Sequence, residues 1–172
     1  MSIKPASSLW DFAIDLYNKP GVETTCLQLQ DEHGFDIPLL LFCCWAGWRY
    51  GAVSVEQLQP VINFSQEWSE QNIQPLRDMR RAMKYGYSQQ WPVDQSDYED
   101  LRQQVKKAEL MSERFLLEGL EKLTDQWGVS SRGGESYFHN VNLCFPSMDF
   151  TEGLLSQQIK TLLASIAQVS AP

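Results

Sequence analysis

The sequence predicts an all-α protein, a compact single-domain bundle of about six helices. Apolar residues recur with a helical period through most of the chain, and capping residues, Pro and Gly divide it into helix-sized segments. No alternation of strand-like and helical segments occurs, so a parallel β-sheet is not expected. Hydrophobic residues make up 43% of the 172 residues, enough to build a packed core.

The first two predicted helices lie near the N-terminus. Ser8 is a suitable N-cap for the first, which ends near Asn18. Pro20 is placed to open the second, because its missing N–H costs nothing in a first helical turn. This helix runs to about Glu32, and Gly34 can adopt the left-handed conformation that ends it.

The third predicted helix, over residues 39–50, is expected to be the centre of the core. Asp36 can cap its N-terminus, and Pro38 is tolerated in its first turn. The segment is apolar on nearly every side, which is the pattern of a helix surrounded by protein. It is too short to span a bilayer.

The next segment extends from Ser54 to Gly86. Ser54 and Gln57 form a capping box at its start. Pro60 and Pro75 each remove a backbone donor and crowd the preceding turn, so breaks or kinks are expected at both.

Two further helices complete the bundle. The longest spans roughly residues 97–127, and Ser96 and Glu99 form a second capping box at its start. A C-terminal helix lies within residues 150–172. These elements predict a helical core domain over residues 1–127, on which the C-terminal helix packs.

Residues 128–149 are predicted to be a long connection. Connections of this length are usually functional or disordered. Within it, residues 137–145 alternate between apolar and polar side chains. This alternation predicts one short, half-buried extended segment near the C-terminus.

Composition limits the function. The formal charge is −8 and the pI is about 4.7, which argues against binding to nucleic acid or to an anionic membrane. The N-terminus has no apolar run typical of a secretory signal, so a cytoplasmic protein with four reduced cysteines is expected. No metal-ligand spacing is present, and neither a metal nor another cofactor is expected.

A basic stripe is the most distinctive feature of this acidic chain. Arg77, Arg80, Arg81 and Lys84 have the spacing i, i+3, i+4 and i+7, which places them on one helix face. On a helical wheel the stripe lies at the edge of the apolar face. An arginine there can pack its aliphatic stem and still reach a partner.

Three interpretations of the stripe stay open. The four cations could pair internally with acids of the long helix such as Glu109 and Glu113. They could instead bind an outside anion, such as a phosphate, a carboxylate or an acidic peptide, because the guanidinium fork suits planar and tetrahedral anions. A solvated face is the third interpretation.

Three other residues are candidates for a binding surface. Trp48 and Trp91 each lie near a predicted helix end, where an indole ring can reach the surface and line a groove. His139 lies in the long connection, where functional residues are common. Cys144 follows five residues later, on the opposite side of an extended segment, which argues against a nucleophile–base pair.

The chain resembles a family of small bacterial proteins, found mainly in proteobacteria, that is known only as a domain of unknown function. The resemblance covers residues 9–127 and depends on several patterns together: Leu9-Trp10-Asp11-Phe12-Ala13, Gln30-Asp31-x-His33-Gly34, Leu39-Leu40-Leu41-Phe42-Cys43, and Pro75-Leu76-Arg77-x-x-Arg80-Arg81-x-x-Lys84. Pro38 departs from the pattern, since that position is typically polar in the family. The resemblance implies a compact cytoplasmic bacterial domain and supplies no catalytic residues.

The sequence therefore favours a non-enzymatic domain that binds a protein partner or a small anionic ligand. It contains no nucleophile–base arrangement, metal-ligand spacing or phosphate-binding loop. The alternative is a small enzyme that uses the arginines to hold an anionic substrate between helices. A structural subunit of a larger assembly is a third hypothesis.

Overall fold

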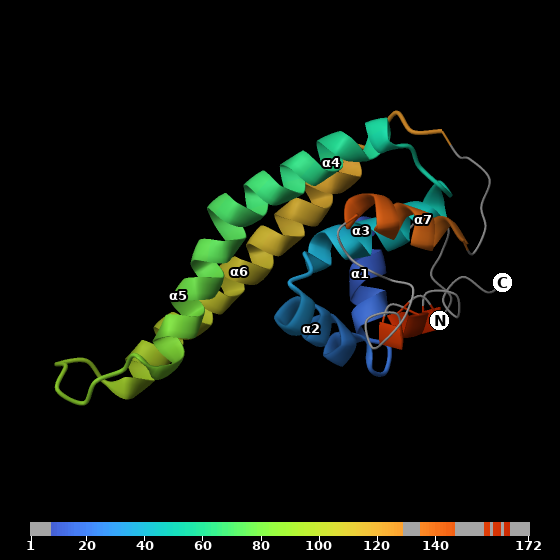
Figure 1. Ribbon diagram of the computed structural model, residues 1–172. Coiled ribbons are helices and arrows are strands. Elements are labelled where there is room, and N and C mark those ends of the chain that lie inside the picture. The colour runs from blue at the N-terminus through green and yellow to red at the C-terminus, as the bar shows by residue number, and fades with distance from the viewer. Residues whose placement is uncertain (1–7, 129–134, 147–156, 159, 163, 166–172) are drawn as a thin grey trace.

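The computed structural model describes residues 8–128, 135–146, 157–158, 160–162 and 164–165 (Figure 1). Every regular element within these residues is helical, which confirms the predicted all-α class. The helices are α1 (Leu9–Tyr17), α2 (Val22–His33), α3 (Ile37–Arg49), α4 (Val55–Trp68), α5 (Gln74–Tyr85), α6 (Gln95–Lys122) and α7 (Glu135–Cys144). A π-helical turn, Ser69–Ile73, joins α4 to α5.

The molecule consists of a globular body and a projecting arm (Figure 1). Helices α1, α2, α3 and α7 form the body. The arm is an antiparallel pair of long helical segments, in which α4, the π-helical turn and α5 run out together and α6 returns beside them. The arm meets the body where α6 packs against α1 and α3.

Helix α3 is the centre of the core, as its all-round apolar sequence predicts. Its residues from Ile37 to Gly47 are buried. Asp36 caps its N-terminus and accepts a hydrogen bond from the backbone N–H of Leu39 at 3.2 Å. Asp36 therefore satisfies one of the free N–H groups in the first turn of α3, without a partner from elsewhere in the chain.

Two glycines set the limits of α2. Gly34 is the C-cap with φ of 70°, in the left-handed region that the sequence predicts for it. The predicted start at Pro20 is wrong, because α2 begins at Val22 after Gly21, whose φ is 80°. The left-handed residue turns the chain between α1 and α2.

The arm is held together by close contacts between its two halves. Trp68 of α4 donates its indole N–H to the carbonyl oxygen of Ser112 on α6 at 3.0 Å. Gly119 of α6 lies opposite Phe64, where an added Cβ would come within 2.6 Å of the ring. The absence of a side chain at Gly119 allows the aromatic ring to pack directly on the α6 backbone.

Local signals in the arm are confirmed in part. The capping box of Ser54 and Gln57 is present at the start of α4. However, α4 continues through Pro60 without a break. The predicted second capping box is wrong, because α6 begins at Gln95 with Asp94 as its N-cap.

Residues 137–145 are not extended, so that prediction is wrong: they lie almost entirely in α7. The buried positions of α7 include Ser136, Asn140, Val141 and Cys144, which recur with a helical period. Two of them are polar, so the apolar pattern alone gives a false alternation of period two. The side chain of Asn140 accepts from the N–H of Val53 at 3.0 Å and donates to the carbonyl oxygen of Gly51 at 3.1 Å.

The described part of the C-terminal segment is also helical and lies against the body. Leu162 is fully buried in the core, and Gln158 donates to the amide oxygen of Gln28 on α2 at 3.3 Å. Predictions for residues 1–7, 129–134, 147–156 and 166–172 lie outside the described residues. Among the described helices, none has the length and apolar character needed to cross a bilayer.

Candidate functional site

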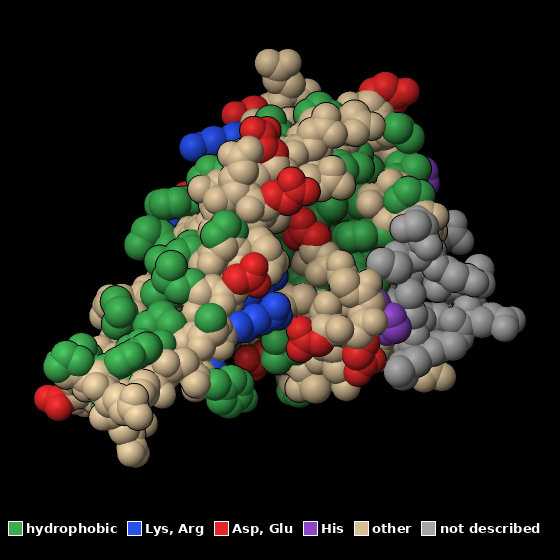
Figure 2. All heavy atoms as spheres, turned by 60° about the vertical axis from the view of Figure 1, so that its left-hand side comes forward, with side chains coloured by type: hydrophobic (Ala, Val, Ile, Leu, Met, Phe, Trp, Pro, Cys, Tyr) green, Lys and Arg blue, Asp and Glu red, His purple; other side chains and the backbone are tan. Residues whose placement is uncertain are grey.

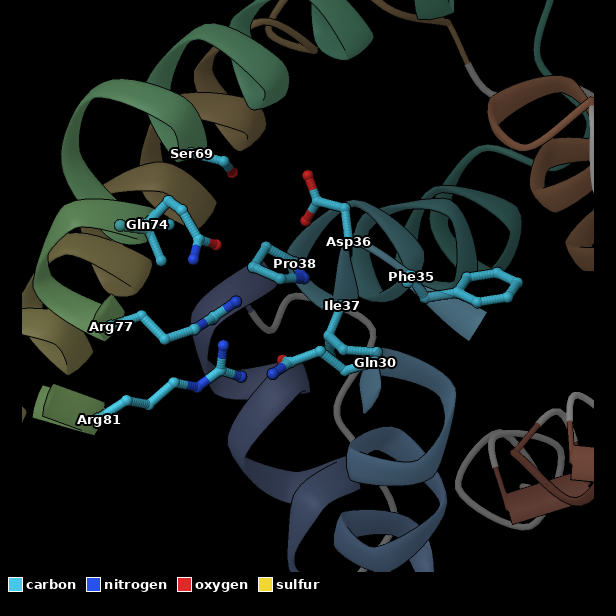
Figure 3. Close-up of a pocket in the computed structure, with 11 residues that line it drawn as sticks. Gln30, Phe35, Asp36, Ile37, Pro38, Ser69, Gln74, Arg77 and Arg81 are labelled. Atoms are coloured by element: carbon cyan, nitrogen blue, oxygen red, sulfur yellow. The ribbon is translucent and has the colours of Figure 1, made fainter. Parts of the chain in front are cut away.

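A polar pocket lies where the arm meets the body (Figure 3). Its volume is about 280 Å³. One wall comes from the π-helical turn and α5, and the other comes from the end of α2 and the start of α3. Its polar lining consists of Gln30, Asp36, Ser69, Gln74, Arg77 and Arg81.

Two members of the basic stripe are paired internally with α6. Arg77 contacts Glu113 at 2.8 Å through Nη2 and Glu109 at 3.3 Å through Nε. Arg80 donates from Nε to the other carboxylate oxygen of Glu109. The side chain of Glu109 is only 10% exposed. We call these four residues, Arg77, Arg80, Glu109 and Glu113, the arginine–glutamate network. The network joins α5 to α6, and its two glutamates are the ones that the sequence indicates as possible partners.

The two glutamates of the network differ in pKa. Burial alone would raise the pKa of Glu109, but hydrogen bonds and charge from Arg80 and Arg77 outweigh burial and lower it. Burial dominates at Glu113 and raises its pKa, because Arg77 is its only hydrogen-bonded arginine within the described structure. Glu109 is therefore the more readily ionised of the two glutamates.

The other two cations of the stripe have different surroundings. Arg81 is 53% exposed, and its Nη2 lies 3.8 Å from Oδ1 of Asp31, whose side chain is 62% exposed. An exposed pair at this distance is weak. Lys84 lies outside the pocket lining, with its Nζ 5.1 Å from the centre of the Tyr85 ring. Figure 2 shows Lys and Arg side chains at the junction between arm and body, with acidic side chains around them.

The pocket therefore receives two guanidinium groups with different roles. In Figure 3, Arg77 and Arg81 both point from α5 towards the body, and the amide of Gln30 faces Arg81. Arg77 is 15% exposed and held by the network, whereas Arg81 can exchange its weak partner for another anion. The geometry supplies a guanidinium fork and an amide group from opposite walls.

Asp36 forms part of the opposite wall. Burial raises the pKa of its carboxyl group, although a hydrogen bond from the Ser65 hydroxyl at 2.8 Å opposes this shift. Its second oxygen caps α3. Both oxygens therefore have structural partners.

An apolar cavity of about 310 Å³ adjoins the polar pocket. Gln30, Ile37 and Pro38 line both spaces. Most of its remaining lining is apolar and comes from α1, α3 and α6: Trp10, Ile14, Leu41, Leu110 and Leu117. Its polar lining residues are Tyr17, Asn18, Gln30 and Glu113.

The remaining candidates from the sequence lie elsewhere in the molecule. Trp48 is half-buried in the body, with its ring stacked on Phe12 at 6.1 Å. Trp91 lies in the loop between α5 and α6, at the far end of the arm, and is 47% exposed. His139 is exposed on α7, where its Nε2 lies 3.0 Å from the carbonyl oxygen of Val53. None of the three lines the polar pocket or the apolar cavity.

Sequence reasoning missed the residues that complete the pocket. Gln30, Ser69 and Gln74 come from three different segments, and no spacing within the chain connects them. Pro75 was the available signal, because it predicted an irregular backbone beside the stripe. Within the described residues, no group of three or more His, Cys, Asp or Glu side chains could hold a metal ion.

Fold and site together define an all-α protein with an arm of two antiparallel helical segments and a small polar pocket at the base of the arm. The chain belongs to the family described as "Protein of unknown function (DUF2390)", whose pattern matches residues 8–120. That range includes the arginine–glutamate network and every residue that lines the polar pocket. Searches of the curated proteins and of the solved structures found no match.

Proposed function

We propose that this protein is a non-enzymatic cytoplasmic binding domain that holds a small anionic ligand in the polar pocket. The observation that carries the proposal is the division of the basic stripe. Arg77 and Arg80 are neutralised by α6, whereas Arg81 is half exposed at the pocket with only a distant partner. A guanidinium in this state can gain a bidentate hydrogen bond to a ligand at little cost.

The size of the pocket favours a small ligand over an acidic peptide helix. Its volume of about 280 Å³ is at the lower end of the range for small-molecule sites. Arg77 is already oriented by the network, so less conformational entropy is lost when the ligand binds.

The alternative is an enzyme that holds an anionic substrate in the same pocket. Such an enzyme needs a proton donor or acceptor beside the substrate. Asp36 is the one carboxyl group in the described pocket lining, and both of its oxygens are engaged with Ser65 and Leu39. The arrangement favours binding over catalysis.

Calorimetric titration with acetate, octanoate, inorganic phosphate and sulfate tests this proposal. We expect saturable binding of at least one anion, and Arg81→Gln should weaken it by about tenfold or more, the loss typical of one charge-assisted hydrogen bond. Arg81→Lys should recover only part of the affinity, because the ammonium group lacks the planar fork.

Lys84→Gln is the matched control. It removes one positive charge from the same helix face but does not touch the pocket lining. Equal losses in Lys84→Gln and Arg81→Gln would show that general charge, not the pocket, attracts the anion. Failure of every anion to bind would overturn the proposal.

A further inference from the structure

The polar pocket and the apolar cavity share one wall, and this arrangement allows a more specific inference that rests on the proposed function. Gln30, Ile37 and Pro38 line both spaces. A ligand that contacts Arg81 on one side of this wall can therefore extend over Pro38 into the apolar cavity. Each space alone is small for a ligand site, at about 280 and 310 Å³, but together they have the volume of a typical one.

We propose that the ligand is an amphipathic monocarboxylate, whose carboxylate pairs with Arg81 and whose hydrocarbon part lies in the apolar cavity. Most of the cavity lining is aliphatic or aromatic, and Leu110 and Ile14 are 55% and 41% exposed without a ligand. Covering these side chains with a hydrocarbon chain removes apolar surface from water on both partners.

Charge around the pocket favours a single negative charge. The three arginines of the stripe lie near four acids from neighbouring elements: Asp31, Asp36, Glu109 and Glu113. Arg81 is the least neutralised of the three arginines, so one carboxylate can be accommodated there. A phosphate dianion would bring a second charge close to Asp31 and Asp36 without a second free guanidinium.

The same charges fix the direction of the ligand. Glu113 lines the apolar cavity, where its carboxylate would repel a ligand carboxylate. The guanidinium of Arg77 is already bonded to Glu113 and Glu109. The carboxylate end of the ligand is therefore directed to Arg81, and the hydrocarbon end to the cavity.

Calorimetry with four probes tests the inference: acetate, octanoate, octyl phosphate and 1-octanol, each below its aggregation concentration. Octanoate should bind at least about tenfold more tightly than acetate, since burial of two methylene groups suffices for this ratio. Octanoate should also bind more tightly than octyl phosphate and 1-octanol. Arg81→Gln should reduce octanoate binding to the level of 1-octanol.

A matched pair of variants locates the hydrocarbon end. Leu110 and Met111 are neighbours on α6 with similar exposure, 55% and 53%, but only Leu110 lines the cavity. Leu110→Glu should abolish most of the preference for octanoate over acetate, whereas Met111→Glu should retain it. Both positions are exposed, so both variants should fold, which circular dichroism can check.

The outcomes separate this inference from the proposed function. Arg81-dependent binding of acetate and octanoate with equal affinity would overturn the amphipathic ligand and leave the anion site intact. Tighter binding of octyl phosphate would overturn the assignment of a monocarboxylate. Octanoate binding that ignores both Arg81→Gln and Leu110→Glu would place the ligand elsewhere and overturn the inference. If no probe anion binds, the proposed function itself fails.

Discussion

Glu109→Gln tests whether the arginine–glutamate network holds the arm together. The substitution preserves the size of the side chain and removes the negative charge with which both Arg77 and Arg80 pair. Glu109 is 10% exposed and Arg77 is 15% exposed, so bulk water screens the interaction only partly.

The magnitude follows from the contacts. Arg80 Nε makes a close charge-assisted hydrogen bond, whereas the hydrogen bonds of Arg77 Nε and Arg80 Nη2 to Glu109 are slightly longer than usual, at 3.3 Å each. Glu109→Gln weakens one strong and two weak hydrogen bonds. Arg80 is 26% exposed and can turn towards solvent in the variant, which limits the loss. We therefore expect the free energy of unfolding to fall by about 2–3 kcal/mol.

Urea denaturation followed by circular dichroism measures this loss. Glu118→Gln is the control on the same helix: Glu118 pairs with Arg114 at 2.7 Å, but both side chains are more than one-third exposed. An exposed i,i+4 pair contributes only about 0.3–0.5 kcal/mol. If Glu109→Gln costs no more than Glu118→Gln, the network does not stabilise the arm and the reasoning is refuted.

The stability difference between wild type and Glu109→Gln should depend on pH. The pKa of Glu109 is lowered in the folded protein, so its stabilising contribution is complete above the unfolded value of about 4.3 and is lost as the pH falls through the folded pKa. The difference in stability between wild type and Glu109→Gln should therefore be largest near neutral pH and shrink at acidic pH. A constant difference across this range would contradict the assignment.

Two further predictions concern the contact of α7 with α3 and with the segment that follows α3. Gly47→Ala should cost about 1–3 kcal/mol of stability, because an added Cβ would lie 2.7 Å from the ring and 3.2 Å from the Cα of Tyr137, whereas Gly128→Ala, with nothing within 4 Å, should be nearly neutral in the same urea experiment. Asn140→Ala should cost about 2–4 kcal/mol, because it leaves the buried N–H of Val53 and two carbonyl oxygens without their partner. Hydrogen exchange should show the loss of protection at Val53; unchanged protection there would contradict this role of Asn140.

Local chemistry explains which parts of the fold the sequence predicts. Asp36 and the pair Ser54 and Gln57 bond to backbone groups three residues away, so the cap and its target belong to the same short segment. The all-round apolar sequence of α3 similarly requires burial wherever the helix lies. These features do not depend on the arrangement of distant segments.

The misread α7 depends on distant segments. Asn140 is fully buried, yet it is polar, and its partners Val53, Gly51 and Cys43 are nearly a hundred residues away. Without knowledge of those partners, a polar residue at this position appears solvent-exposed, and the buried helical face is hidden. A cysteine contact of the same kind, 2.8 Å between the sulfur atoms of Cys43 and Cys144, is equally invisible in the sequence.

The basic stripe was predictable as a helix face, but its division was not. Spacing alone places all four cations together and makes Glu109 and Glu113 reasonable partners. Whether an individual arginine faces α6 or the body depends on the approach of α2, which carries Gln30 and Asp31 about fifty residues earlier in the chain. That tertiary contact separates the structural arginines from Arg81.

The π-helical turn explains how one helix can line the whole pocket. Ser69, Ile73, Arg77 and Arg81 are spaced by four residues, and all of them line it. In a regular α-helix each step of four residues advances by about 40° beyond a full turn, so the first and last would diverge by about 120°. A π-helical turn bonds residues five apart, so four residues make less than one full turn and part of this divergence is cancelled.

The side chain of Asn72 in that turn donates to the carbonyl oxygen of Trp68 at 3.3 Å, and Pro75 lies in the first turn of the regular helix that follows. The irregular turn thus has its own local support. It keeps Ser69 on the same side of the helix as Arg77 and Arg81, facing Asp36 across the pocket (Figure 3). The turn itself packs Ile73 into the core, at 2% exposed, whereas no residue of α5 is buried, so Arg77 and Arg81 beyond the turn can line the pocket.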